Sequence, residues 1–330
     1  MSKRKNAKNI AYFCVILILV LVMLYSGLQI LESTVFHSQQ QDDAHVSKTI
    51  IRNGVEYFPR QDITVLMVLG IDRYGVVQSS GSYNNPGDSD MVALLVFDDV
   101  REVCDVLYLN RDTMLEIPVL GIGGKQAGTI FGQLALSHTY GSGLEDSCEN
   151  VKNTLEAFLP GLTIDYYVSM HMDAISILND SVGGVTVTVT DDFSDVDPSI
   201  LMGSFTLKGE QAIQYVRTRK DVGDQKNVTR MERQQAYIRS FLDAFHKQVE
   251  SSDSYLINTF EEVSPYIVTD CSTNTLIGLF DRYSDYAIGE FITPEGENIM
   301  GDQYYEFYAD DEALDELILQ LFYAEKMNKT

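Results

Sequence analysis

An arginine-rich segment at residues 216–239 is the part of this sequence best equipped for chemistry. The chain of 330 residues has a formal net charge of -24 at pH 7, yet this segment holds seven cations against three acids. A guanidinium group presents its N–H donors as a planar fork that matches two oxygens of a phosphate or a carboxylate. The segment is therefore predicted to bind an anion, and a solvated helix face with ordinary ion pairs is the alternative.

The arginines of this segment fall into two groups. On an extended strand, the two-residue spacing of Arg217 and Arg219 directs both side chains to one face. Thr229 and Glu232 have the spacing of a capping box, which predicts a helix with Thr229 as its N-cap and Arg230 as its first residue. The free N–H groups at such a helix start attract anions by themselves.

The same predicted helix adds further side chains to the anion site. Arg233 and Gln234 follow Arg230 by three and four residues, so the three share one helix face. Guanidinium and amide donors gathered at a helix N-terminus suit a ligand of the size of a pyrophosphate. Further along, Ile238 and Phe241 lie on the apolar face of this amphipathic helix.

Acidic residues flank two predicted strands. Asp72 follows the apolar run at residues 63–69, and Asp88 and Asp90 directly precede the run at 91–97. If these strands are parallel neighbours, the carboxylates project at one solvent-accessible edge of the sheet. Carboxylate oxygens beside arginines suit a magnesium ion that bridges phosphate oxygens. The alternative is that Asp72 caps a turn and that the other two are loop acids.

The elements that must position these residues follow from apolar runs and periodic segments. Their alternation predicts an α/β fold, in which a central, mainly β-sheet is flanked by helices on both faces. An Asn53-Gly54 turn signal predicts a hairpin at the entry to the domain. Strands are predicted at residues 63–69, 91–97, 103–109, 166–170 and 185–190, and helices at 147–159, 173–179 and after the arginine-rich segment.

The N-terminus has the pattern of a membrane anchor. Residues 1–9 carry four cations and no acid, and the uncharged residues 10–31 span roughly 33 Å as a helix, enough for a bilayer core. The basic flank predicts a cytoplasmic N-terminus and an extracellular remainder, in a single-pass protein of the cell membrane. A cleaved signal peptide is the alternative, but the run is long for one and no small-x-small cleavage site follows it.

The chain divides into five predicted segments. A Ser-Ser-Asp-Ser break near residue 251 separates the main domain from an acidic tail, which is expected to be an accessory lobe or a packing extension. The segments are a cytoplasmic tail at residues 1–9, a transmembrane helix at 10–31, a stalk and entry hairpin at 32–59, a catalytic domain at 60–249 and a C-terminal accessory extension at 250–330.

Composition excludes one class of partner and leaves the cysteines open. The strong acidity argues against nucleic acid, whose phosphate backbone requires a basic surface. Outside the predicted anchor the chain has Cys104, Cys148 and Cys271. Either one disulfide and one free thiol or three isolated thiols fit this odd number.

An ordered set of motifs over roughly residues 60–247 resembles the LytR–CpsA–Psr family of cell-wall ligases. A predicted membrane anchor precedes the set, as it does in that family. The matching motifs are LGIDR (69–73), SDM (89–91), NRDT (110–113), IDYYV (164–168), VGGVTV (182–187), GEQAIQYVRTR (209–219) and RMERQQ (230–235).

The resemblance implies an α/β domain that transfers a glycopolymer phosphate from a polyprenyl-pyrophosphate donor to a peptidoglycan acceptor, with Mg²⁺ as cofactor. It implies that Asp72 and Asp90 hold the metal, and that the lipid tail of the donor needs an apolar slot, which Ile238 and Phe241 are expected to line. The candidate catalytic residues are Arg111, Asp112 and Asp224, with Asp112 or Asp224 as the general base. The family pattern is not complete, because Asn110, Gln133 and Asn227 replace a proline, a lysine and an aspartate that are common in it. The implied pyrophosphate-binding set is Arg111, Arg217, Arg219, Arg230, Arg233 and Gln234.

Phosphoryl transfer needs positioning and neutralisation of charge on the phosphate oxygens, which arginines and a metal supply. The sequence therefore predicts an extracytoplasmic phosphotransferase. Two alternatives stay open: a non-catalytic sensor or carrier that binds a polyprenyl-phosphate lipid, and a pyrophosphatase that uses water as the acceptor.

Overall fold

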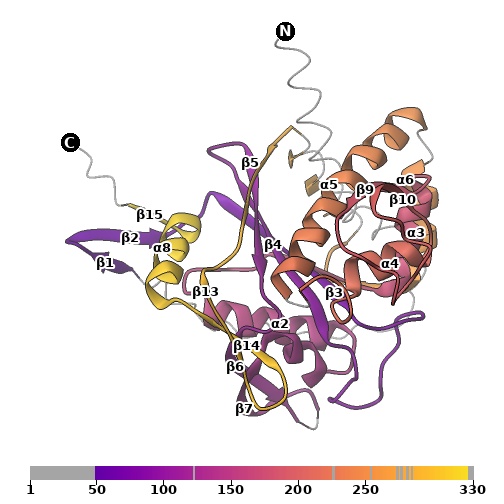
Figure 1. Cartoon of the computed structure of the whole chain (residues 1–330). Coiled ribbons are helices and arrows are strands. Elements are labelled where there is room, and N and C mark those ends of the chain that lie inside the picture. The colour runs from indigo at the N-terminus through magenta and orange to yellow at the C-terminus, as the bar shows by residue number, and fades with distance from the viewer. Residues whose placement is uncertain are drawn as a thin grey trace, which may run out of the picture.

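The computed structural model (Figure 1) describes residues 49–325, apart from residue 122 and short gaps at 225–226, 253–254, 273–274, 276–277, 280–281 and 284. The predicted cytoplasmic tail, the transmembrane helix and all of the stalk up to residue 48 lie outside the described residues. Among the described residues, no helix has the length and apolarity needed to cross a membrane.

A central sheet of six strands forms the framework, in the order β11-β8-β3-β4-β5-β12. Its middle is an antiparallel meander of β3, β4 and β5, whereas β8 runs parallel to β3 and β12 runs parallel to β5. The strands are β3 (Ile63–Ile71), β4 (Ser89–Asp98), β5 (Val103–Leu109), β8 (Tyr166–His171), β11 (Ile267–Thr269) and β12 (Ala287–Ile292).

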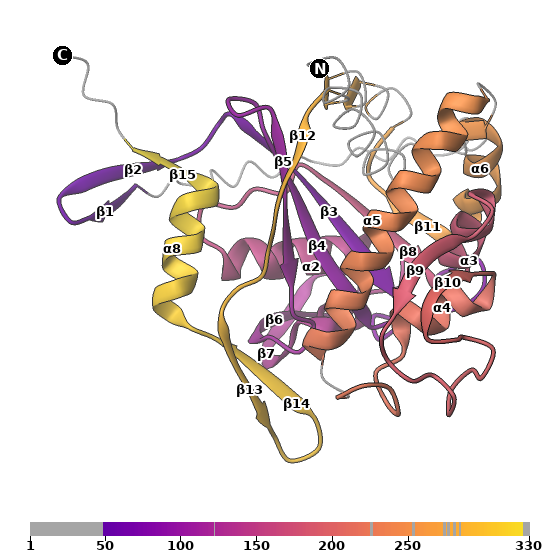
Figure 2. The ribbon, with the colours of Figure 1, turned by 45° about the horizontal axis from the view of Figure 1, so that its top comes forward.

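The central strands are continuous apolar runs because both faces of the sheet are covered. Along β3, Leu66 and Val68 face one buried cluster, whereas Val65, Met67 and Leu69 face the other. Figure 2 shows helices on either side of the strands. The first cluster includes α3 (Met172–Ser181), α4 (Glu210–Arg217), α5 (Asn227–Ser251) and α6 (Tyr255–Val263), and the second includes α2 (Glu145–Phe158), the 3₁₀ helix η2 (Leu134–Tyr140) and α8 (Asp311–Phe322).

This layering confirms the predicted α/β fold with helices on both faces. The condition attached to the acidic residues, that their strands are parallel, is wrong. Strands β3 and β4 pair antiparallel with Ile71 opposite Ser89, so the end of one strand meets the start of the other. The two acidic groups still meet, because the backbone N–H of Asp72 donates to the carbonyl oxygen of Asp88 at 2.9 Å. We call this junction, which carries Asp72, Asp88 and Asp90, the acidic turn.

Short antiparallel pairs surround the sheet. The predicted entry hairpin is confirmed, since Asn53 and Gly54 take φ angles of 53° and 80° and join its two strands. The remaining elements are β1 (Ile50–Arg52), β2 (Val55–Pro59) and β15 (Tyr323–Glu325) in one small sheet, the pairs β6 (Met114–Leu120) with β7 (Gln126–Gln133), β9 (Val185–Val189) with β10 (Gly203–Leu207), and β13 (Gly296–Met300) with β14 (Tyr305–Ala309), and the 3₁₀ helix η3 (Ser264–Tyr266).

The segment after residue 250 is built into the same fold. Strands β11 and β12 occupy the two edges of the central sheet, and α8 buries Leu314 and Ile318 in the cluster that it shares with α2. Of the two roles expected for this segment, it has that of a packing extension. In Figure 2 the β13–β14 hairpin projects from the body of the molecule.

The three cysteines outside the predicted anchor are free thiols. Cys104 and Cys148 are buried, and burial raises the pKa of both thiols. Of the two arrangements left open by the sequence, the structure has three isolated thiols.

A buried carboxylate stabilises the end of β4 that lies away from the acidic turn. Asp98, 1% exposed, accepts hydrogen bonds from Arg60 Nη1 at 2.8 Å and from Arg101 Nε at 2.6 Å. Burial alone would raise the pKa of Asp98, but the hydrogen bonds from Arg60 and Arg101 outweigh it and hold this pKa well below its usual range.

We expect Asp98→Asn to lower the free energy of unfolding by about 3–5 kcal/mol at pH 7, because two guanidinium groups lose their buried partner. The folded-state pKa of Asp98 is depressed, so this stability is present above the unfolded-state value of about 3.9 and is lost as pH falls toward the folded-state pKa. Urea denaturation between pH 7 and pH 2 measures both effects. Asp62→Asn, at a 39% exposed partner of Arg60, is the control and should cost less. A pH-independent difference between Asp98→Asn and wild type would contradict this account.

Candidate functional site

The acidic turn and the arginine-rich segment meet at the end of the central sheet where β3 ends and β4 begins. Arg217 forms a two-point pair with Asp72, in which Nε donates to Oδ1 at 2.9 Å and Nη2 donates to Oδ2 at 3.0 Å. Hydrogen bonds to Asp72 raise the pKa of Arg217. The expected extended strand at this position is wrong, because Arg217 is the last residue of helix α4. Arg219 follows after the helix has ended.

Asp90 pairs with two arginines in the interior. Arg230 Nη1 donates to Asp90 Oδ2 at 3.1 Å and Nη2 donates to the Asp90 carbonyl oxygen at 3.1 Å, while Arg111 contacts the other carboxylate oxygen. Burial lowers the pKa of Arg230 and of Arg111, and repulsion between the two lowers that of Arg111 further. Asp90 is only 9% exposed, so the expected solvent-accessible position of this carboxylate is wrong.

Asp112 forms a third pair beside these two. It is 2% exposed and accepts from Arg219 Nη1 at 3.1 Å and from Gln133 Nε2 at 3.1 Å. Gln133 is one of the departures from the family pattern, and here it supports the carboxylate of Asp112 while also donating to the Tyr305 carbonyl oxygen at 2.7 Å. The other candidate base, Asp224, is exposed and accepts from Thr229 Oγ1 at 2.6 Å.

The predicted start of the long helix is wrong. Helix α5 begins at Asn227, so Thr229 lies inside it and is not its N-cap, and Arg230 is not its first residue. The side chain of Asn227 lies outside the described residues. Helix α5 therefore begins three residues earlier than the Thr229–Glu232 spacing indicates.

The remaining two predicted pyrophosphate ligands hold α5 against α4. Arg233 Nη1 donates to Asp191 Oδ2 at 2.7 Å, and the same guanidinium contacts the carbonyl oxygens of Tyr215 and Thr218. Gln234 Nε2 donates to the Val216 carbonyl oxygen at 2.9 Å. The structure therefore brings Arg111, Arg217, Arg219 and Arg230 together with acids of the sheet edge, whereas Arg233 pairs with Asp191.

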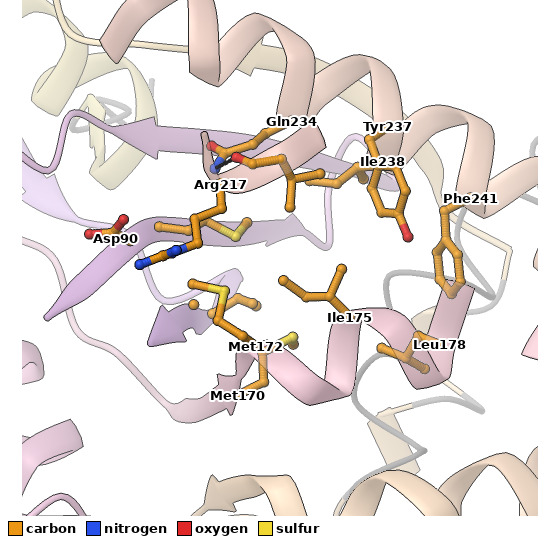
Figure 3. Close-up of a pocket in the computed structure, with 14 residues that line it drawn as sticks. Asp90, Met170, Met172, Ile175, Leu178, Arg217, Gln234, Tyr237, Ile238 and Phe241 are labelled. Carbon is orange, nitrogen blue, oxygen red and sulfur yellow. Dashed lines mark hydrogen bonds between the residues drawn. The ribbon is translucent and has the colours of Figure 1, made fainter. Parts of the chain in front are cut away.

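An apolar slot opens at the charged cluster. It encloses about 780 Å³, including the part open to solvent. Figure 3 shows Asp90 and Arg217 at one end and Leu178 and Phe241 at the other. The expected lining by Ile238 and Phe241 is confirmed. The walls are Val68, Gly70, Met91, Met170, Met172, Ile175, Leu178, Val216, Gln234, Tyr237, Ile238 and Phe241.

Three slot methionines, Met91, Met170 and Met172, were not singled out from the sequence. They occupy the start of β4, the end of β8 and the start of α3, next to the acidic turn. Methionine adapts its shape to irregular apolar surfaces, which suits a flexible hydrocarbon ligand. Their clustering at strand ends is the signal that identifies them, and it becomes visible only once the strand order is known.

The carboxylates of the acidic turn offer oxygen ligands of the kind that a magnesium ion prefers. Burial raises the pKa of Asp88, Arg111 opposes this shift, and the negative charge of Asp72 adds to it. Asp88 has one long contact, from Arg111 at 3.5 Å. A partly buried carboxylate next to a second one fits a hard cation with oxygen ligands. Within the described residues, however, no group of three or more His, Cys, Asp or Glu side chains is arranged as a metal site.

Comparisons with known proteins point to one family. The profile of the LytR_cpsA_psr family matches residues 25–322. A relative from Bacillus licheniformis, named polyisoprenyl-teichoic acid–peptidoglycan teichoic acid transferase TagU, is 23% identical over 341 residues, 99% of each chain. The Bacillus subtilis transferase TagT, with the corresponding name, is 25% identical over 291 residues, 84% of this chain and 83% of its own. The crystal structure of gbs0355 from Streptococcus agalactiae has the same fold, with a TM-score of 0.64 and 22% identity over 79% of this chain and 86% of that one.

We expect Asp90→Asn to lower the free energy of unfolding by about 3–5 kcal/mol, because it leaves Arg230 and Arg111 close together without their buried counter-charge. Chemical denaturation measures the loss. Asp88→Asn is the matched control on the same turn. Its side chain is 37% exposed, so its removal should cost less than about 1 kcal/mol. Equal stability of the two variants would show that Asp90 does not hold the cluster together.

Proposed function

This chain belongs to the LytR–CpsA–Psr family, and from that membership we propose that it is a glycopolymer phosphotransferase of the cell wall. Its donor is a glycan on a polyprenyl pyrophosphate, and its acceptor is a sugar hydroxyl of peptidoglycan. The names of the relatives TagU and TagT, both teichoic acid transferases to peptidoglycan, support this assignment. The proposed location is the outer side of the cell membrane, with residues 10–31 as the anchor.

The observation that carries the proposal is an apolar slot whose mouth is charged. A polyprenyl pyrophosphate has a long hydrocarbon tail and a compact polyanionic head, and the slot offers a matching surface for each. Arg217 and Asp90 line the slot themselves, so the apolar surface for the tail and the arginine cluster for the head form one continuous site. The tail would lie between α5 and α3, against Ile175 and Ile238, with the pyrophosphate at the mouth.

The arginines would bind the pyrophosphate by exchanging partners. In the structure Arg217, Arg219 and Arg111 each pair with a carboxylate, which holds the guanidinium groups in place before a ligand arrives. Side chains of the first two are 39% and 33% exposed, so they can turn toward phosphate oxygens. Arg230 is 3% exposed and stays paired with Asp90, so it contributes positive charge to the site from the protein interior. Preorganised charge of this kind stabilises a phosphoryl-transfer transition state.

In the proposed reaction, the acceptor hydroxyl oxygen attacks the phosphorus nearer the glycan. A new P–O bond forms, the bond from that phosphorus to the bridging oxygen breaks, and polyprenyl phosphate leaves with the bonding electrons. The hydroxyl proton passes to a carboxylate, for which Asp112 and Asp224 are the candidates. Asp112 lies next to the arginines, and it must release Arg219 or Gln133 to accept the proton.

We include Mg²⁺ in the proposal as the cofactor. Asp72 and Asp90 remain the proposed ligands. Asp88 joins them because, of the three carboxylates, it has the weakest contact with an arginine to balance its charge. A bound magnesium ion supplies further positive charge to the phosphate oxygens. Asp72 can serve only by giving up one of its two contacts with Arg217, which matches the release of that arginine toward the pyrophosphate.

A transfer assay tests the function. The full-length protein is incubated with a glycan-labelled polyprenyl-pyrophosphate donor and peptidoglycan, with magnesium or with a chelator. We expect label covalently attached to peptidoglycan, one polyprenyl phosphate released per transfer, and loss of both with the chelator. Donor binding without product would identify a sensor or carrier, and free glycan phosphate without attachment would identify a pyrophosphatase.

We expect Arg217→Lys to weaken the binding of a short-chain polyprenyl pyrophosphate about 10- to 150-fold, because an ammonium group cannot reproduce a two-point contact with phosphate. Isothermal titration calorimetry measures the affinity. Arg282→Lys, at a 59% exposed arginine paired with Asp99, is the control and should bind as wild type does. Unchanged affinity of Arg217→Lys would remove this arginine from the pyrophosphate site.

We expect Ile238→Asn to weaken binding of the same lipid about 10-fold or more, since burying an isoleucine side chain contributes about 1.5–3 kcal/mol. Inorganic pyrophosphate, which has no tail, should bind the variant and the wild type equally. Calorimetry with both ligands separates the two effects, and Ile51→Asn, at a 69% exposed residue of β1, serves as the control. Equal weakening for both ligands would indicate general damage to the fold.

A further inference from the structure

We propose that a second pocket, polar and next to the acidic turn, binds the hydroxyl-bearing sugar that accepts the glycopolymer. This inference rests on the proposed transfer function, for which it names the acceptor site. The pocket lies between the loop at residues 73–86, helix η2 and the end of β8, and encloses about 470 Å³, including the part open to solvent. Its lining includes Arg73, His138 and His171.

The first support is a buried histidine with an unpaired nitrogen. His138 is 1% exposed, and its Nδ1 lies 2.7 Å from the carbonyl oxygen of Gly87, which can only accept. Nδ1 is therefore the protonated nitrogen, and Nε2 keeps a lone pair. Burial lowers the pKa of His138 to about 4, so the ring is neutral near pH 7. Within the described part of the chain, Nε2 has no hydrogen-bond partner, which predicts a ligand that donates an O–H or N–H to it.

A second histidine repeats this arrangement in the same pocket. His171 Nδ1 lies 2.8 Å from the carbonyl oxygen of Gly75, so its Nε2 is likewise an acceptor. The two rings are close enough that His171 lowers the pKa of His138. Backbone carbonyl oxygens thus fix two imidazole rings, each with its accepting nitrogen directed away from the bonded carbonyl.

The charge of the pocket decides which ligand it fits. Arg73 lines the pocket and lowers the pKa of His171, in addition to the effect of burial, whereas the negative charge of Asp173 opposes that shift. The charged neighbour of His138 is Asp146, which raises its pKa against the larger effect of burial. The Arg73 guanidinium beside His171 opposes a metal cation, although fixed neutral histidines could otherwise hold one. The unprotonated Nε2 atoms oppose an anion that carries no proton. A neutral group with several hydroxyls offers donors to the imidazoles and acceptors to the guanidinium, as a sugar ring does.

The position of the pocket matches the acceptor side of the reaction. Arg73 directly follows Asp72, and Gly87, which is held by His138, directly precedes Asp88. The segments that carry the acidic turn are therefore also the walls of the polar pocket. A sugar bound there would lie next to the cluster that holds the phosphates, and the hydrocarbon tail would lie in the apolar slot along α5.

Two substitutions at one position separate the two ring nitrogens. In His138→Asn the side-chain amide N–H can keep the bond to the Gly87 carbonyl oxygen, but the variant lacks the acceptor at the Nε2 position. His138→Gln places an amide at the Nε2 position and loses the anchor to Gly87. With a soluble peptidoglycan-type oligosaccharide of N-acetylated amino sugars as acceptor, we expect His138→Asn to raise the acceptor KM about 3- to 10-fold. The Kd for a short-chain polyprenyl pyrophosphate should be unchanged in this variant.

A binding measurement that needs no turnover completes the test. In the wild-type full-length protein, the ¹⁵N resonance of His138 Nε2 should shift as this oligosaccharide is added, and it should not shift with inorganic phosphate. An unmoved resonance at saturating oligosaccharide, or an unchanged acceptor KM in His138→Asn, would overturn the proposal. If the wild type shows no transfer at all, the proposed function fails, and the resonance shift still decides whether the pocket binds a sugar.

Discussion

The buried pairing of Asp90 with Arg230 and Arg111 is the interaction on which the rest of the site depends. Bringing two guanidinium groups together in a protein interior is costly unless an anion compensates their charge. Asp90 supplies that anion from the first residues of β4, and Arg230 reaches it from the first turns of α5. The pair therefore fixes α5 against the start of β4. The position of α5 in turn defines the apolar slot, which α5 lines with Gln234, Tyr237, Ile238 and Phe241.

Around this buried pair the exposed arginines are held less tightly. Arg217 pairs with Asp72 and Arg219 with Asp112, and about a third or more of each arginine side chain is exposed. The site thus combines a fixed positive charge in the interior with movable guanidinium groups at the surface. Such a gradient suits a reaction in which a pyrophosphate must be gripped, and one of its phosphates must then be released with the lipid.

The sequence was informative where one local property determined the structure. The apolar runs at residues 63–69 and 91–97 were predicted to be buried strands and are confirmed, and the Asn53-Gly54 turn is a hairpin because few residues tolerate its positive φ angles. The arginines and acids of the site were identified by type and order along the chain. The helix face at Ile238 was recognised as apolar from its period.

Features that depend on contacts distant in sequence were not predictable in the same way. Arg217 is the last residue of helix α4. The two-residue spacing of Arg217 and Arg219 suggested a strand instead. The antiparallel course of β3 and β4 depends on the long loop between them, which carries no strand-order signal. The short strand β11 acquires its role from pairing with β8. The slot methionines are indistinguishable from core residues until the position of α5 is known.

The most direct measurement of the central claim is the structure of the protein with a short-chain polyprenyl pyrophosphate bound. The account predicts phosphate oxygens within hydrogen-bonding distance of Arg217, Arg219 and Arg111, with the Arg230–Asp90 pair intact below them. It predicts the hydrocarbon chain along the slot, in contact with Ile175 and Ile238. A lipid bound elsewhere, with the Arg217–Asp72 and Arg219–Asp112 pairs undisturbed, would contradict it.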